Sequence, residues 1–482
     1  MPAELPRLRR SGGARPRAGI VHLGLGAFFR AFGAVYVEDA VRLSGGDWGI
    51  VGVSLKSAGT RDRLAPQDFV YTTVSQAADG AETIRKVEIL ADVLVAPEDP
   101  EAVLARMADP AIRIVTLTVT EKGYCHDPAT GKLNPDHPDI VHDLHNPLPR
   151  SAPGFLVRAL ARRRAAGHPP FTVLTCDNLP ENGRLVRGVV LDLARRIDPA
   201  LGAWIEAEGR FPATMVDRIT PATKPGDIER LAHKTGIFDA APVLCEPFRQ
   251  WVVEEDFVPA YGAGGRPDLA AAGVELVADV TPYEQMKLRM LNGTHSSLAY
   301  LGYLAGHETI ADTVADPAFA AFVRRLWRKE IMPSFAAPEG VDLEDYAAAL
   351  LERYSNPAIR HRTWQIAMDG SQKLPQRILG AIADNLTAMR PSPGLILAVA
   401  AWMRYVGGTD ERGRPIEVRD PLASRLRALS DGAVTPTEKV GALLSVRDIF
   451  SPELAAQLSE PAGRAYELLC RVGARRAVED LT

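Results

Sequence analysis

The chain has 482 residues, of which 46% are hydrophobic and 24% are charged; this composition excludes a disordered or collagen-like chain and indicates a globular protein of several domains. Its formal net charge is −4, from 56 Lys and Arg residues against 60 Asp and Glu residues, so a general binder of nucleic acids or anionic membranes is not expected. No apolar run reaches the roughly 20 residues of a membrane span, and the first residues lack a signal-peptide stretch, which favours a cytoplasmic protein.

The first half of the chain alternates short apolar runs with helix-like segments. Strands are predicted at residues 20–25, 48–55, 87–95, 112–120 and 171–176, and helices at residues 27–43, 154–166 and 181–197. Nearly continuous apolar strands are typical of a parallel sheet that is buried on both faces. The alternation therefore predicts an α/β fold with a doubly wound, Rossmann-type sheet.

The second half of the chain is mainly helical. After a last strand at residues 274–280, helices are predicted at residues 283–305, 317–331, 343–354, 374–389, 395–405 and 460–478. We therefore predict two domains. Residues 1–280 form a dinucleotide-binding Rossmann-type domain, and residues 281–482 form a mainly α-helical domain that carries substrate and catalytic groups.

A glycine turn follows the first predicted strand. Gly24 and Gly26 occupy the first two positions of a dinucleotide fingerprint, in which glycines bring a pyrophosphate close to the N-terminus of the next helix, while Phe29 holds the third position. The predicted cofactor-binding residues are those of this turn: Gly24, Gly26, Ala27, Phe28 and Arg30.

The end of the second predicted strand does not decide between NAD and NADP. An acidic residue there would bind the ribose of NAD, but the chain reads Ser54-Leu55-Lys56-Ser57. Lys56 or Arg61 could instead meet a 2′-phosphate.

The strongest local feature is K-x4-N-x2-H, formed by Lys287, Asn292 and His295 at the start of the predicted helical domain. On a regular helix, at ~100° per residue, Asn292 lies about 140° from Lys287 and His295 about 80° from it, so the three share one broad face. Asp177-Asn178 and Asp217-Arg218 add polar residues at or beside apolar runs of the first domain, where open parallel sheets bind ligands.

The surrounding motifs resemble those of the mannitol dehydrogenase family of polyol-specific long-chain dehydrogenases. The similarity runs from about residue 20 to about residue 380 and rests on GLGAFFRAF, TLTVTEKGY, TCDNLPENG, FPATMVDRITP, CEPFRQWVVEEDF and YEQMKLRMLNGTHSSLAYLGYLAG. The stretches TEKGYC and HRTWQIAMDGSQKLPQR, the latter at residues 361–377, most resemble the fructuronate reductase branch of that family.

The resemblance implies an NAD-linked, metal-independent hydride transfer that interconverts D-fructuronate and D-mannonate. Lys287 matches the general acid/base, Asn178 and Asn292 match the pair that binds the reacting oxygen, and His295 matches a substrate-orienting residue. Asp217 and Lys373 match further substrate contacts. The alternative within the family is a mannitol 2-dehydrogenase or related polyol dehydrogenase.

A sugar acid would favour cationic side chains in its pocket. Arg360, Arg362, Lys373 and Arg377 lie in or beside the branch-specific stretch, and we expect at least two of the four on a solvated face. Arg360 and its neighbour His361 are included among the predicted substrate-binding residues. Glu284, three residues before Lys287, is a candidate proton relay or a surface ion-pair partner.

Two other classes of protein were weighed. A metal hydrolase would use the histidines near residue 142, but that region reads as a Pro/Asp/His-rich loop without a helix to set the ligand geometry, so no metal is expected. The four cysteines form no C-x-x-C pair that would add ligands. A non-catalytic NAD sensor would have no use for Lys287, Asn292 and His295.

Overall fold

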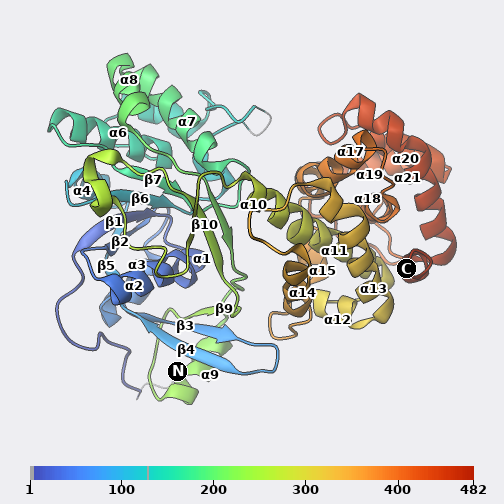
Figure 1. The fold of residues 1–482 in the computed structure, drawn as a ribbon, viewed down its shortest axis with the longest axis horizontal. Helices are drawn as coiled ribbons and strands as arrows, with labels where there is room; N and C mark the ends of the chain where they lie inside the picture. The colour runs from blue at the N-terminus through green and yellow to red at the C-terminus, as the bar shows by residue number, and fades with distance from the viewer. Residues whose placement is uncertain (1–4, 128–129) are drawn as a thin grey trace. The chain divides into compact units, whose positions relative to one another are not determined.

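The computed structural model describes residues 5–127 and 130–482. These residues form two compact units that divide between Val280 and Thr281 (Figure 1). The named strands lie in unit 1, the part up to Val280, and the described residues of unit 2, Thr281–Thr482, are built from helices and their connections. The predicted fold class, a Rossmann-type unit followed by a mainly helical one, is confirmed.

The main sheet of unit 1 is parallel throughout, with the strand order β5-β2-β1-β6-β7. Its strands are β1 (Ala18–Leu23), β2 (Gly49–Ser54), β5 (Leu90–Val95), β6 (Ile114–Leu117) and β7 (Thr172–Thr175). The chain adds strands on one side of β1 and then on the other, so the order reverses between β1 and β6. Dinucleotides bind outside the carboxyl ends of the strands at such a switch point.

Two layers of helices cover this sheet because its strands are apolar on both faces. Val21 and Leu23 pack with α4 (Pro100–Ala108), α6 (Ala152–Ala165) and α7 (Asn182–Ile197) in one cluster. Ile20, from the same strand, packs on the other face with α1 (Ala27–Ala31) and α2 (Gly33–Ser44). The helix predicted at residues 27–43 is thus two helices. The break falls at Phe32, whose fully buried ring packs against Trp251, and this tertiary contact overrides helix continuity.

Two small sheets complete unit 1. One joins the hairpin of β3 (Tyr71–Gln76) and β4 (Glu82–Val87) to β9 (Val243–Cys245), and the other has the order β11-β10-β8. Its strands are β8 (Thr214–Asp217), β10 (Gln250–Glu254) and β11 (Glu275–Val277). The single strand predicted at residues 87–95 is wrong, because Val87 ends β4 and a new strand, β5, starts at Leu90.

Short helical elements connect the strands of unit 1. They are α3 (Gly59–Leu64), η1 (Ala65–Gln67), η2 (Glu121–Tyr124), α5 (Pro138–His145), α8 (Pro199–Glu208), α9 (Pro225–Thr235) and η3 (Pro259–Gly265). Several helices begin with an Asp or Ser cap followed closely by proline, as at Asp99 before α4 and Ser151 before α6. The cap accepts an N–H of the first turn, and proline there has no N–H to satisfy.

Unit 2 begins with one continuous helical rod of three parts. These are α10 (Thr281–Met286), the π-helical segment η4 (Lys287–Gly293) and α11 (Thr294–Ala305). The remaining elements are α12 (Ile310–Ala315), α13 (Pro317–Leu326), η5 (Trp327–Ile331), η6 (Met332–Ser334), α14 (Leu343–Tyr354), α15 (Thr363–Ile366), α16 (Gly370–Leu374), η7 (Pro375–Leu379), α17 (Gly380–Thr387), α18 (Pro393–Val406), α19 (Ala423–Asp431), α20 (Pro436–Leu444), α21 (Pro452–Val472) and α22 (Ala474–Glu479). Within the described ranges, no helix is both long and apolar enough to cross a membrane.

Candidate functional site

The glycine turn after β1 is held against the end of β6. Gly24 has a φ of +92°, and a Cβ atom there would overlap the carbonyl oxygen of Thr118. The Thr118 hydroxyl also donates to the carbonyl of Gly24 at 2.8 Å. Gly26 is exposed and precedes α1. Glycine is therefore required at position 24 by a close crossing of two turns at the switch point of the sheet.

The buried side chain of His22 stabilises this turn. Its ring stacks on Phe29 with 3.4 Å between the ring centroids, and its two nitrogens lie 2.8 Å from the Thr116 hydroxyl and 3.0 Å from that of Thr118. Burial lowers the pKa of His22 to about 3. The imidazole is therefore neutral at pH 7 and acts as a rigid polar support for the glycine turn.

The other predicted cofactor residues differ in exposure. Ala27 and Phe28 are partly exposed at the start of α1. Arg30 is buried, donates to the carbonyl of Ala241 at 2.6 Å and lies over the ring of Tyr71. Its guanidinium therefore ties α1 to the small sheet, and a role for it in cofactor binding stays a prediction.

The end of β2 presents an unpaired cation to solvent. Lys56 is exposed and forms no ion pair with the described residues, whereas Arg61 pairs with Glu98 and, at 2.8 Å, with Asp62. Because the charge of Arg61 is already neutralised, Lys56 is the better placed of the two to meet a 2′-phosphate. The geometry at the end of β2 therefore does not decide whether the cofactor is NAD or NADP.

A carboxylate fastens the loop after β6 to the end of β7. Asp177 accepts hydrogen bonds from the backbone of Val119 and Thr120, at 2.9 and 3.0 Å, and from the hydroxyl of Tyr124 at 2.6 Å. Burial raises the pKa of Asp177, although these three donors favour its charged form. The predicted site residue Asn178 follows directly and is exposed.

The second predicted substrate residue of unit 1 ends strand β8. Asp217 is buried and lies opposite Gln250 of β10 in the antiparallel register. The base of β8 is joined to α7 by Asn182, which accepts from the backbone N–H of Thr214 at 2.9 Å and donates back to its carbonyl at 2.9 Å. The carboxyl ends of β7 and β8 thus present Asn178 and Asp217.

In unit 2 the predicted catalytic motif coincides with the π-helical segment η4. Each N–H of a π-helix bonds the carbonyl five residues back, so residues five apart lie one turn apart on the same side. Lys287 and Asn292 have this spacing. The regular helix assumed for the sequence, which put them about 140° apart, is therefore wrong. Lys287 is only 7% exposed, and the partly buried amide of Asn292 makes no hydrogen bond to the described residues.

Close packing explains why a glycine, Gly293, follows Asn292. A Cβ atom on Gly293 would overlap the backbone carbonyl oxygen of Arg377, which lies in a second π-helical segment, η7. Arg289, from the other side of η4, pairs with Asp384 at 2.6 Å and also bonds Ser334. The segment is therefore fixed between structural contacts on one side and the side chains of the motif on the other.

His295 and His361 lie together just after this segment. Their ring centroids are 4.7 Å apart, and the ring of Tyr354 stacks on His295 at 5.3 Å. Burial, with smaller contributions from His361, Arg377 and other nearby cations, lowers the pKa of His295 well below its usual value, and burial lowers that of His361 to about 4. Both imidazoles are neutral at pH 7 and suit hydrogen bonding to hydroxyl groups.

Two cations beside these histidines have no acidic partner. Lys373 donates to the carbonyl of Met368 at 2.6 Å, and Arg377 donates to the hydroxyl of Ser296 at 3.2 Å. Neither forms an ion pair with any carboxylate that the structure describes. Burial lowers the pKa of both, that of Lys373 to about 8.

The other two arginines of the stretch lie outside this group. Arg360 is 67% exposed and Arg362 is 42% exposed, and both approach Glu308, at 4.0 and 3.5 Å. The expectation that at least two of the four cations face solvent fits this arrangement. The substrate role predicted for Arg360 is less favoured than the same role for Lys373.

The histidine-rich region of unit 1 is not the loop that we expected. Residues Pro138–His145 form helix α5, in which His142 bonds Asp143 at 2.9 Å. The same carboxylate accepts two hydrogen bonds from Ser151 and so works as a structural anchor. Nearby, ligand atoms of Cys125, His137 and Asp139 lie within 4.8 Å of one another. Burial raises the pKa of the Cys125 thiol to about 12, which disfavours the thiolate that binds metals.

Comparison with known proteins gives the family. The mannitol dehydrogenase Rossmann domain matches residues 18–262, and the mannitol dehydrogenase C-terminal domain matches residues 279–470. The chain belongs to the mannitol dehydrogenase family. D-mannonate oxidoreductase of Escherichia coli is 46% identical over 97% of this chain and 96% of that protein. A mannitol 2-dehydrogenase of Aspergillus fumigatus is 40% identical, over 94% and 89% of the two chains.

Solved structures agree with this assignment. The ternary complex of Pseudomonas fluorescens mannitol 2-dehydrogenase with NAD and D-mannitol aligns with a TM-score of 0.85 at 38% identity, over 99% of this chain and 97% of the other. A D-sorbitol dehydrogenase in substrate-free form aligns with a TM-score of 0.87 at 33% identity, over 98% of each chain. This member of the mannitol dehydrogenase family is therefore an oxidoreductase.

Some residues around the motif have no local signal in the sequence. Tyr354 and Trp327 contact η4 from distant parts of the chain. Spacing within a single motif contains no information about such long-range contacts.

Proposed function

We propose that this dehydrogenase is NAD-dependent and interconverts a keto sugar acid and its hydroxy acid, D-fructuronate and D-mannonate. Unit 1 would bind the dinucleotide, and unit 2 would supply the proton-transfer group and most substrate contacts. The similarity to D-mannonate oxidoreductase over nearly the whole chain supports this substrate. A cytoplasmic location, and the absence of nucleic-acid and membrane partners, stay predictions.

The observation that carries the proposal is a pair of buried cations, Lys373 and Arg377, that form hydrogen bonds but no ion pair with the described carboxylates. Burying a charge without a counter-charge is costly, and the lowered pKa of Lys373 is one measure of that cost. A substrate carboxylate would supply the missing charge and can accept a bidentate pair from arginine. A neutral polyol would supply no counter-charge to either cation.

The glycine turn of unit 1 fits a dinucleotide. Gly24 and Gly26 leave the end of β1 without side chains at the switch point, where a pyrophosphate would lie. NAD is favoured because the aligned mannitol 2-dehydrogenase structure contains it. When bound, the nicotinamide supplies or accepts the hydride.

The residues of the chain would then handle the proton and the oxygen. Lys287, in its protonated form, donates a proton to the carbonyl oxygen during reduction and takes it back during oxidation. The amides of Asn178 and Asn292 donate hydrogen bonds to the same oxygen and stabilise its developing negative charge. Neutral His295 orients the sugar through its hydroxyl groups. The roles of Asp217, His361 and Glu284 remain predictions of substrate contact and proton exchange.

The second candidate is a mannitol 2-dehydrogenase. It is favoured by the alignment with the Pseudomonas fluorescens enzyme over nearly the whole of both chains. The same fold and the same K-x4-N-x2-H motif would serve fructose and mannitol. Lys373 and Arg377, two buried cations without an ion-pair partner among the described carboxylates, favour the sugar acid over the neutral sugar.

A substrate panel tests the proposal directly. Reduction of fructuronate, tagaturonate and fructose is followed with NADH and with NADPH, and oxidation of mannonate, mannitol and arabinitol with the oxidised cofactors. We expect fructuronate and NADH to give by far the highest kcat/KM. Equal rates with fructose, or a preference for it, would replace the proposal with the mannitol 2-dehydrogenase.

A further inference from the structure

The π-helical segment η4 needs support from outside its own helix. Runs of i→i+5 hydrogen bonds are rare and short because α-helical geometry is more stable. A segment of seven residues, Lys287–Gly293, is therefore expected to depend on neighbouring groups that hold its peptide units in place. Two buried aromatic side chains meet that need.

The first support is a pair of hydrogen bonds to consecutive carbonyl groups. The indole N–H of Trp327 donates to the carbonyl of Met290 at 3.0 Å, and the hydroxyl of Tyr354 donates to the carbonyl of Leu291 at 2.7 Å. The carbonyl of Leu291 belongs to the peptide group that leads into Asn292. The hydroxyl of Tyr354 thus restrains the peptide group that immediately precedes Asn292.

The second support is a stack of three rings. Tyr354 stacks on His295 with an interplanar angle of 26°, and Trp327 stacks on the same tyrosine with an angle of 23°. Trp327 also donates to the hydroxyl of Thr294, at 2.8 Å, the residue between Gly293 and His295. One side chain, Tyr354, therefore restrains both the peptide before Asn292 and the ring of His295.

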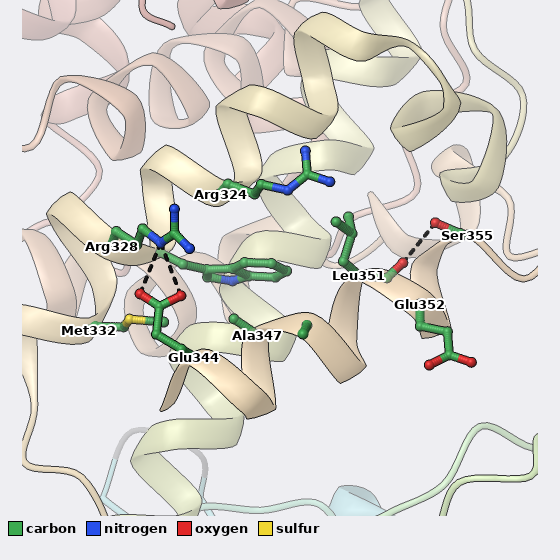
Figure 2. A pocket seen from close by; sticks show the side chains of 10 residues that line it. Arg324, Arg328, Met332, Glu344, Ala347, Leu351, Glu352 and Ser355 are labelled. Atoms are coloured by element: carbon green, nitrogen blue, oxygen red, sulfur yellow. Dashed lines mark hydrogen bonds and ion pairs between the residues drawn. The ribbon is translucent and has the colours of Figure 1, made fainter. Parts of the chain in front are cut away.

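Trp327 is fully buried and also forms part of the wall of a pocket. Figure 2 shows this pocket of about 400 Å³, whose rim includes Met332, Leu351 and the ion pair of Arg328 with Glu344, at 2.9 Å. A ring beside an empty volume loses dispersion contacts on that side. The indole N–H, shared between the carbonyl of Met290 and the hydroxyl of Thr294, therefore adds a directional constraint to the packing of the ring.

We propose that Tyr354 and Trp327 are positioning residues that hold η4 in its π-helical form and so place Asn292 and His295 for the reaction. The inference rests on the proposed catalytic roles of these two residues. Neither aromatic side chain needs to touch the substrate. Their effect on the reaction passes through the backbone of η4 and the ring of His295.

The test compares two tyrosines in the same unit. Tyr354→Phe removes only the hydroxyl, and Tyr405→Phe is the matched control, since Tyr405 is buried but its hydroxyl makes no hydrogen bond to the described residues. Trp327→Phe is paired in the same way with Trp402→Phe, because the N–H of Trp402 has no partner among those residues. Three quantities are measured: amide hydrogen exchange of residues 288–295 in the ligand-free protein, kcat with the fastest substrate of the panel, and KM for NADH.

We expect Tyr354→Phe and Trp327→Phe each to speed exchange in residues 288–295 about tenfold and to lower kcat about tenfold, with KM for NADH within twofold, because small displacements of reacting groups are costly. The control variants should change none of the three quantities. The proposal is overturned if Tyr354→Phe exchanges like Tyr405→Phe, or if exchange rises while kcat stays within twofold of the parent. If no panel substrate is turned over, the proposed function fails, and the exchange data alone decide whether the two rings hold the segment.

Discussion

Replacing Lys373 should remove a pH dependence from the binding of a sugar acid. Burial lowers the pKa of this lysine from 10.5 to about 8, so it loses its charge within an accessible pH range. If it binds the substrate carboxylate, affinity must fall as the amine deprotonates. With a pKa of about 8, the charged fraction drops from about nine-tenths at pH 7 to about one-tenth at pH 9, which predicts a roughly tenfold loss of affinity, or about 1.4 kcal/mol.

The assay is titration of mannonate into the protein saturated with NADH, a combination that cannot react, at pH 7, 8 and 9. Lys373→Met should bind mannonate weakly, and its affinity should not change with pH, because residue 373 then has no charge that titrates. Lys373→Arg should bind tightly at all three values, because a guanidinium stays protonated. The same titrations in a Lys287→Met background test whether the amine of Lys287 contributes to the pH dependence. The reasoning is refuted if the parent protein binds mannonate with equal affinity at pH 7 and 9. It is also refuted if the affinity of Lys373→Met falls with pH as steeply as that of the parent.

The ligand-free protein should show a related effect on stability. Since the pKa of Lys373 is about 8 in the folded state and 10.5 is its ordinary value, the unfolded chain binds more protons between these two pH values. The free energy of unfolding contributed by this group therefore rises with pH across that window. Denaturant unfolding at pH 8 and pH 10 should show the rise in the parent, and a smaller one in Lys373→Met.

Three further changes test separate parts of the site. Lys287→Ala should abolish turnover while NADH still binds by fluorescence titration; normal turnover would mean that another group donates the proton. Arg377→Met should raise KM for fructuronate by about 10²-fold, in line with the loss of one partner of a buried ion pair, and leave fructose reduction nearly unchanged; an equal effect on both sugars would argue against a carboxylate contact. Gly293→Ala should lower Tm by several degrees, because its Cβ would overlap the carbonyl of Arg377, whereas Gly188→Ala, with open space around its Cβ, should not; equal Tm values would contradict the close packing of the two π-helical segments.

The main sheet was predictable because its strands have a strong local signature. Apolar runs such as residues 20–25, bounded by glycine turns, can only be buried between two layers. The small sheets were harder, since strands like Tyr71–Gln76 mix polar and apolar residues and depend on partners far along the chain. The sequence does not predict helix α5, because its proline and histidines are typical of a loop; the proline, Pro138, stands in the first turn, where it is tolerated.

The motif of the candidate site was visible in the sequence, but its geometry was not. The α-helical periodicity that the sequence suggests for Lys287 and Asn292 does not apply within η4, and His295 follows in α11. The π-helical form is set by Trp327, Tyr354 and the carbonyl of Arg377, which come from three other elements. Likewise, only the folded structure separates the buried cations from the solvated arginines.

The π-helical segment also constrains how this chain can vary in length. A π turn holds about one residue more than an α turn, so deleting a residue within Lys287–Gly293 would let the rod revert to regular hydrogen bonding. The helix after the deletion would then keep its orientation, because the residue lost is the one that the wider turns accommodate, but the spacing between Lys287 and Asn292 would change. Single-residue deletions here should be tolerated by folding far better than by catalysis, which makes this stretch intolerant of length change although it lies inside a helix.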